Sequence, residues 1–136
     1  MHRITDLIDR HGVDIDPHLD RQATVPVATG LQRQGDIIVI PAPVVEVGET
    51  ASKPVPQCGV PVVRGEAGGN THLLLADGDV RWDAAPADLT LGVLTVDEGA
   101  TAYLAHPEHG YAGIGPGTYV IRRQREQADE IRMVQD

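Results

Sequence analysis

Residues 34–41 read Gln-Gly-Asp-Ile-Ile-Val-Ile-Pro, and this stretch decides the predicted fold. The apolar residues 37–40 form a continuous run, which is typical of a strand buried on both faces. Pro41 ends the run, because proline cannot donate a backbone hydrogen bond within a sheet. We therefore expect a compact β-domain over residues 34–136, beginning at Gln34 and preceded by a separate segment, residues 1–33.

Short strands are predicted along most of this domain. Apolar or alternating runs bounded by turn residues lie at 44–47, 60–64, 71–76, 80–82, 89–96, 101–105 and 118–125. Asp77-Gly78 predicts a tight hairpin, and a second hairpin is expected around Asp97-Glu98-Gly99. Residues 106–117 are expected to form a loop, and residues 126–134 a short helix or strand. The spacing predicts an all-β, mainly antiparallel fold: a small β-sandwich, jelly roll or barrel.

Residues 1–33 are predicted to form a short helix followed by an extended arm. Ile4, Leu7 and Ile8 fall at i, i+3 and i+4, and Gly12 suits a left-handed helix end. Such a helix is too short to be stable alone, so its apolar stripe must dock on another surface. The arm either wraps its own domain or reaches a neighbouring protein.

The composition limits the classes of partner and compartment. The chain has 136 residues, no Phe, one Trp and three Tyr, so aliphatic side chains must fill its core. A formal net charge of −9 argues against nucleic acid, which binds mainly through Lys and Arg. No apolar run is long enough to span a membrane, and the start lacks a secretory segment. One cysteine permits no disulfide within the chain. We expect a cytoplasmic protein, or a virion-associated one after assembly.

The sequence His-Pro-Glu-His-Gly at 106–110 raises the question of a metal site. Imidazole and carboxylate groups bind zinc, iron or nickel, and three such ligands leave an open position. His106 and His109 have suitable spacing, and His72 or Glu66 would complete the set if their strands are neighbours. The alternative is a polar turn, because His-Pro favours an extended residue and His-Gly is ordinary turn chemistry.

The remaining polar motifs contain no recognisable catalytic set. Cys58 lies in a Pro- and Gly-containing loop without a charged or histidine neighbour to lower its pKa. A local basic cluster, Arg122, Arg123 and Arg125, lies near the end of this acidic chain. It either binds an anionic surface, such as an acidic region on another copy, or forms a solvated strand edge protected by charge. An enzyme is therefore not the first expectation.

The combined motifs resemble a group of small, mostly uncharacterised bacterial and phage-associated β-proteins. The pattern runs QGD, then G-E-x-T-G-H-x-H, then H-x-E-H-G, then P-x-G-x-Y-x-V-x-x-Q-R-E. The corresponding stretches here are 34–36, 65–72, 106–110 and 116–126, so the resemblance covers residues 34–136 and leaves out the arm. It implies a β-domain but no particular activity.

This chain departs from the pattern at two positions. Gly68 replaces Thr, and Asn70 replaces the first histidine of the H-x-H pair. If that pair binds metal in relatives, this chain has lost one ligand. A weaker resemblance to cupins, β-barrels that hold a metal on histidines, does not extend to the order of the histidines.

Two functions follow as hypotheses. The first is a non-enzymatic structural or interaction module, such as an accessory protein of a phage or capsid-like assembly. It would attach to a protein partner or to further copies of itself through the arm and the domain surface, and needs no cofactor. The second is a metal-binding, cupin-like β-barrel protein or enzyme that uses His72, His106 and His109, with Glu66 as a further ligand.

Overall fold

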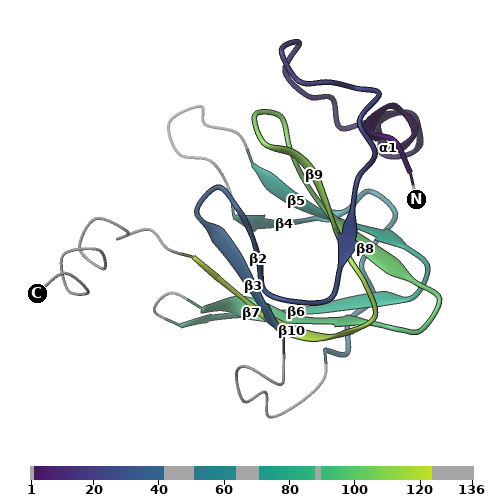
Figure 1. The fold of residues 1–136 in the computed structure, drawn as a ribbon. Coiled ribbons are helices and arrows are strands. Elements are labelled where there is room, and N and C mark those ends of the chain that lie inside the picture. Colours follow the sequence, from purple (N-terminus) through teal and green to yellow (C-terminus); the bar gives the residue numbers. More distant parts are fainter. Residues whose placement is uncertain (1, 42–50, 64–70, 88–89, 124–136) are drawn as a thin grey trace, which may run out of the picture.

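The computed structural model describes residues 2–41, 51–63, 71–87 and 90–123, which contain one helix and ten strands (Figure 1). In chain order the elements are α1 (Ile4–His11), β1 (Val27–Ala28), β2 (Gln32–Gln34), β3 (Ile37–Pro41), β4 (Val60–Val63), β5 (His72–Asp77), β6 (Val80–Ala87), β7 (Thr90–Val96), β8 (Thr101–His106), β9 (Gly110–Ile114) and β10 (Gly117–Arg123).

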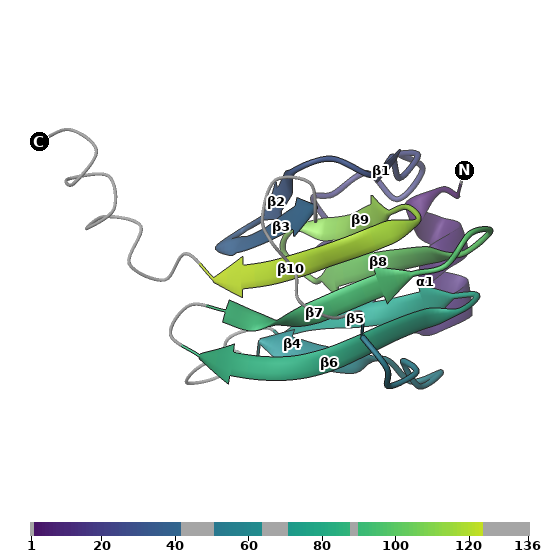
Figure 2. The ribbon, with the colours of Figure 1, turned by 90° about the horizontal axis from the view of Figure 1, so that it is seen from below.

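The strands form two five-stranded sheets that face each other. The first sheet has the order β1-β9-β8-β5-β4, and the second has the order β2-β3-β10-β7-β6. Neighbouring strands are antiparallel, except that β1 runs parallel to β9. Figures 1 and 2 show the two layers from the side and from below. The all-β prediction is confirmed, and the described strands form a sandwich, not a closed barrel.

The main core lies between the two sheets, because alternate residues of each strand point inward. Leu74 and Leu104 come from the first sheet, and Val39, Leu94 and Ile121 from the second. In β3 the prediction of burial on both faces is only half right. Ile37, Val39 and Pro41 are buried, whereas the residues between them are partly exposed.

The N-terminal segment packs against the outer face of the first sheet. The helix prediction is confirmed, and Gly12 ends α1 in the left-handed conformation, with φ of 79°. Leu7 is fully buried, and its neighbours form a second apolar cluster between the helix, the segment after it and the sheet. The buried members of this cluster are Ile4, Leu7, Ile15, Val25, Leu75, Tyr103, Ala105 and Tyr111. The arm was expected either to wrap its own domain or to reach a neighbouring protein, and in the structure it packs on its own domain.

Two turns join the sheets where the sequence predicts hairpins. The turn at Asp77-Gly78 leads from β5 in the first sheet to β6 in the second, and residues 97–100 lead from β7 back to β8. The two crossings lie side by side, because the backbone N–H of Asp97 donates to the carbonyl oxygen of Asp79. Both hairpin predictions are therefore wrong. A turn motif indicates that the chain reverses, but not whether the next strand pairs in the same sheet or faces it across the core.

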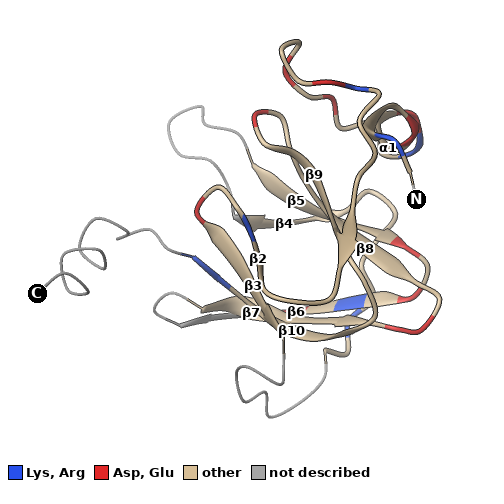
Figure 3. Ribbon diagram, in the orientation of Figure 1, with Lys and Arg blue, Asp and Glu red and all other residues tan. Residues whose placement is uncertain are grey.

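Other predictions are corrected or fall outside the described residues. Residues 110–114, expected within a loop, form strand β9, which pairs with β8. The strand predicted at 44–47 and the element predicted at 126–134 lie outside the described residues. Acidic residues lie at several turns between the strands (Figure 3). In the described part of the chain, no helix is long and apolar enough to cross a bilayer.

Candidate metal centre

Three histidines meet at the end of the sandwich opposite the two crossing turns. His72 begins β5 and His106 ends β8, one step beyond the paired residues Leu73 and Ala105. Both histidines lie in phase with inward-facing core residues, and both are 5% exposed. The ring centroids of His72 and His106 are 4.4 Å apart, and His109 lies 4.6 Å from His106 and 6.0 Å from His72.

His109 belongs to the turn that joins β8 to β9. Residues 107–109 form this turn, and Gly110 follows with φ of 80°, as in three-residue hairpin loops that end in a left-handed residue. The backbone N–H of Glu108 donates to Nδ1 of His106 at 3.0 Å. Neutral His106 therefore carries its proton on Nε2. The turn interpretation of 106–110 thus describes this loop, and the turn itself brings His109 to the other two rings.

The Gln34-Gly35-Asp36 turn approaches the histidines from the second sheet. It joins β2 to β3, and Gly35 has φ of 59°, a conformation that glycine adopts without steric cost. A β-carbon at position 35 would lie 2.8 Å from Nε2 of His109 and 3.4 Å from Cε1 of His72. The missing side chain of Gly35 therefore provides the space for His109.

Gln34 and Asp36 contact the two ring nitrogens of His72. Nδ1 of His72 lies 3.0 Å from Oε1 of Gln34, and Nε2 lies 3.6 Å from Oδ1 of Asp36. The other oxygen of Asp36 accepts a hydrogen bond from Nε of Arg123 at 3.3 Å. The imidazole ring of His72, from the first sheet, thus lies between the side chains of Gln34 and Asp36 from the second sheet.

His72 is a neutral imidazole at physiological pH. Burial lowers its pKa from 6.5 to about 4, and repulsion from His106 lowers it as well, while Asp36 has a weaker, opposing effect. The distance of 3.6 Å between Nε2 of His72 and Oδ1 of Asp36 would suit an ion pair. At neutral pH, however, the ring is uncharged and cannot form one. Because Nδ1 donates its proton to Gln34, the lone pair of His72 is on Nε2, which faces a carboxylate oxygen. Two hydrogen-bond acceptors facing each other need a bridging proton, water or cation.

Further metal-compatible groups lie at the same turn. One ligand atom from each of His106, Glu108 and His109 lies within 4.8 Å of the others. His106 can bind a metal through Nδ1 only by giving up the hydrogen bond from Glu108. We therefore place His106 beside the candidate site and not among its ligands. Asp36 and His72 form a neighbouring carboxylate–imidazole pair, and the ring of His109 lies 6.0 Å from that of His72 and nearly parallel to it.

The structure tests the proximity of most of the predicted site residues. It brings His72, His106 and His109 together, as the metal hypothesis requires, whereas Glu66 lies outside the described residues. Asp36 and Gln34 were not predicted as site residues. Their only signal was the QGD motif of the resemblance, which does not indicate that this turn faces the histidines.

Four of the six predicted interaction residues contact other residues of the chain. Ile4 and Leu7 are buried in the second apolar cluster, and Ile8 is partly buried beside them. Arg123 contacts Asp36. The Nε atom of Arg122 is buried and has no hydrogen-bond partner among the described residues, and Arg125 lies outside them.

From their wide spacing in the N-terminal segment, the other three histidines, His2, His11 and His18, are predicted to be solvated. The side chain of His18 is exposed, as expected. His11 is partly buried beside Tyr103, and burial lowers its pKa. His2 lies 3.6 Å from a carboxylate oxygen of Asp77. The expectation of solvated side chains is therefore wrong for His11.

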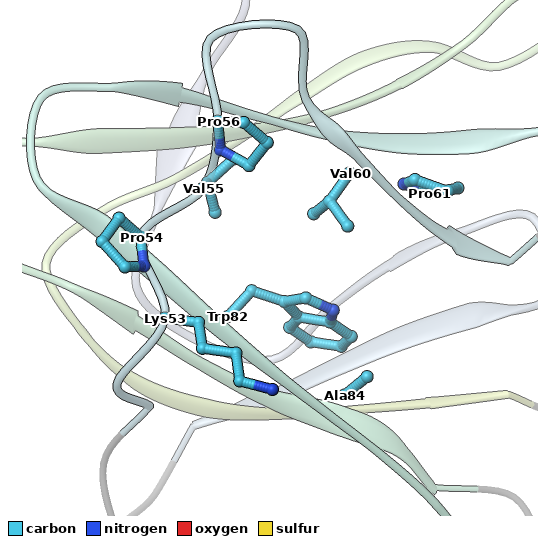
Figure 4. A pocket seen from close by; sticks show the side chains of 8 residues that line it. All are labelled: Lys53, Pro54, Val55, Pro56, Val60, Pro61, Trp82 and Ala84. Atoms are coloured by element: carbon cyan, nitrogen blue, oxygen red, sulfur yellow. The ribbon is translucent and has the colours of Figure 1, made fainter.

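A separate apolar pocket of about 270 Å³ lies between β4, β6 and the segment 53–56 (Figure 4). The indole ring of Trp82 forms one wall, and prolines and valines form much of the rest. The lining residues are Lys53, Pro54, Val55, Pro56, Val60, Pro61, Trp82 and Ala84. Lys53 is the one ionisable side chain in this set, and the lining offers it no acid–base partner.

Comparison with protein families gives one match, to a domain of unknown function, DUF8820, over residues 33–124. The matched region includes the QGD turn, all three clustered histidines and Arg123. Searches of curated proteins and of solved structures gave no match. Because the match covers most of its length, the chain belongs to the DUF8820 family.

Proposed function

We propose that this domain binds one divalent transition-metal ion at the end of the sandwich opposite the two crossing turns. Its ligands would be Asp36, His72 and His109. The observation that carries the proposal is the contact of His72 Nε2 with Oδ1 of Asp36 at 3.6 Å, which brings two acceptors together when the ring proton is on Nδ1. A cation between these two acceptors would turn an unfavourable contact into two favourable ones.

The distances suit a shared ion. Zinc binds imidazole nitrogen and carboxylate oxygen at about 2.0–2.2 Å in tetrahedral geometry, which separates two ligand atoms by roughly 3.4 Å. The observed separation of 3.6 Å between the His72 and Asp36 atoms is close to this value. The ring of His109 lies 6.0 Å from that of His72, with 9° between the two ring planes, and we propose it as the third ligand.

The ligand types limit the choice of metal. Two imidazoles and one carboxylate suit zinc, nickel or ferrous iron better than calcium or magnesium, which prefer oxygen ligands. Arg123 contacts Oδ2 of Asp36, so Oδ1 is the oxygen left for the metal. Three protein ligands leave at least one position for water, for a small molecule or for the nearby carboxylate of Glu108.

Zinc titration of matched variants tests the proposal. Isothermal calorimetry of the metal-free protein should show one zinc ion bound per chain. Asp36→Asn and His109→Ala should weaken binding by more than about 100-fold, beyond the usual effect of a residue that only orients a ligand. His18→Ala removes an exposed imidazole outside the cluster and should leave the affinity unchanged. Equal zinc affinity in all four proteins would refute the proposal.

The interaction module is the second candidate function, and a different surface supports it. Val27 and Leu31 are large apolar residues that are 40% and 60% exposed, and Leu31 borders a shallow pocket with Ile38. β2 is an edge strand of its sheet, and edge strands present backbone groups that a second copy can pair with. The occupant we propose is therefore another copy of this chain. The phage or capsid-like version of this function is supported only by the sequence resemblance.

The oligomeric state tests this second candidate. Light scattering coupled to gel filtration should give a dimer for the wild type and a monomer for Leu31→Asp. Asp9→Ala on α1, an exposed change away from this surface, should remain dimeric. A wild-type protein that stays monomeric at all concentrations would exclude it.

A further inference from the structure

Gln34 is a buried polar residue that connects the two sheets. It ends β2 and is 6% exposed. Its side-chain amide donates to the carbonyl oxygens of Leu104 at 2.9 Å and Gly110 at 3.2 Å, both in the first sheet. These two bonds use both amide protons and fix the orientation of the group, because a flipped amide would place its oxygen against two carbonyl oxygens.

The fixed amide leaves Oε1 of Gln34 as an acceptor directed at His72. Nδ1 of His72 lies 3.0 Å away and must donate its proton to it. The proton is therefore on Nδ1, and the lone pair is on Nε2. Backbone carbonyl oxygens of the first sheet orient the amide of Gln34. The oriented amide in turn determines which nitrogen of His72 carries the proton.

The other tautomer of His72 would close the site. With its proton on Nε2, the ring would direct that proton at Oδ1 of Asp36, 3.6 Å away, and a small approach of the two groups would complete a hydrogen bond. That hydrogen bond would occupy both groups that the proposed metal ion needs. The Nδ1–H tautomer of His72 therefore leaves Nε2 and Asp36 available to a metal ion, whereas the Nε2–H tautomer joins them in a hydrogen bond.

We propose that Gln34 is a positioning residue that selects the Nδ1–H tautomer of His72 and thereby sets the affinity of the site for its metal ion. This inference rests on the proposed metal-binding function. Residues that orient a metal ligand through its second ring nitrogen typically change affinity by about 10- to 100-fold when they are replaced.

A matched glutamine on the same strand provides the control. Gln32 donates its side-chain amide to the carbonyl oxygens of Ala28 and Gly113, and neither bond involves a histidine. Gln34→Met and Gln32→Met therefore remove the same kind of interstrand bond, but only the first removes the acceptor for His72. Both variants are made in the full chain, and zinc is the metal used.

Two measurements on these proteins test the inference. Nitrogen-15 NMR of the histidine rings in metal-free wild type at neutral pH should show His72 protonated on Nδ1. In Gln34→Met the spectrum should move toward the Nε2–H form, and zinc affinity should fall by about 10- to 100-fold. Gln32→Met should retain both the tautomer and the affinity.

The outcomes separate this inference from the proposed function. A wild type that binds no zinc refutes the metal function, whatever its tautomer. A wild type that binds zinc overturns the role of Gln34 if His72 carries its proton on Nε2, or if Gln34→Met binds zinc as tightly as Gln32→Met does. If Gln34→Met does not fold, the wild-type tautomer decides: Nδ1–H supports the role, and Nε2–H overturns it.

Discussion

Each residue of the Gln34-Gly35-Asp36 turn makes a different contact with the histidines. Oε1 of Gln34 accepts a hydrogen bond from Nδ1 of His72, and Asp36 faces the other nitrogen of the same ring. Gly35 contributes by having no side chain, since a β-carbon there would overlap His109. The Gln34-Gly35-Asp36 turn thus fits against the imidazole rings of His72 and His109 from the opposite sheet.

Replacing this glycine tests the contact directly. Gly35→Ala would place a methyl group 2.8 Å from Nε2 of His109 and force alanine to adopt φ of 59°. The left-handed backbone alone costs about 1–2 kcal/mol, so the free energy of unfolding in urea should fall by at least this amount. Gly30→Ala, where a β-carbon meets no atom within 4 Å, is the control and should be nearly neutral. Equal effects would show that His109 does not lie over the turn.

The protonation of His72 makes the metal-free protein sensitive to acid. The unfolded chain takes up this proton near pH 6.5, whereas the folded protein takes it up near pH 4. Between these values the unfolded state binds more protons, so stability decreases as the pH falls. The loss should be on the order of 3 kcal/mol between pH 7 and pH 4.

Urea denaturation of wild type and His72→Gln across this range isolates the effect. Carboxylates titrate in both proteins, so the difference between the two stability curves reports His72. The wild type should lose more stability than the variant as the pH falls. Parallel curves would mean that His72 titrates normally in the folded state.

At the scale of elements, most strand positions could be predicted from the sequence, but β1, β2, β9 and the pairing of the strands could not. Continuous apolar runs at 73–76 and 102–105 mark the strands. The alternation of side chains along a strand then places His72 and His106 on the same face as Leu74 and Leu104. Turn residues at Asp77-Gly78 and Asp97 predict chain reversals that do occur. Contacts across the core determine which sheet the next strand joins, and a local sequence pattern does not predict these contacts.

Helix α1 provides the prediction for this scale. Leu7 is fully buried against the outer face of the first sheet, so Leu7→Ala should cost about 2–5 kcal/mol of unfolding free energy. Asp9→Ala changes an exposed residue of the same helix and should have little effect. Chemical denaturation distinguishes them, and equal stabilities would mean that the helix is not docked on its own domain in solution.

At the scale of the whole molecule, the proposed metal ion joins the two sheets. Asp36 belongs to the second sheet, and His72 and His109 belong to the first. This relation could be predicted only in part. The histidines were identified from their types and spacing, but Asp36 lies far from them in the chain and meets them only because the sheets face each other.

A ligand that binds only the folded chain must stabilise it. At a free zinc concentration of about 100 times the dissociation constant, the free energy of unfolding should rise by about 2.7 kcal/mol. Thermal denaturation with and without zinc measures the change, and Asp36→Asn should show little of it. A stabilisation of equal size in both proteins would place the zinc elsewhere.

The most direct test of the central claim is an anomalous-difference map from crystals of the protein grown with equimolar zinc. We predict one peak at about 2.0–2.2 Å from Nε2 of His72 and Oδ1 of Asp36, with His109 as the third ligand. A map with no peak between these side chains, or with zinc only on histidines elsewhere in the chain, would contradict the account.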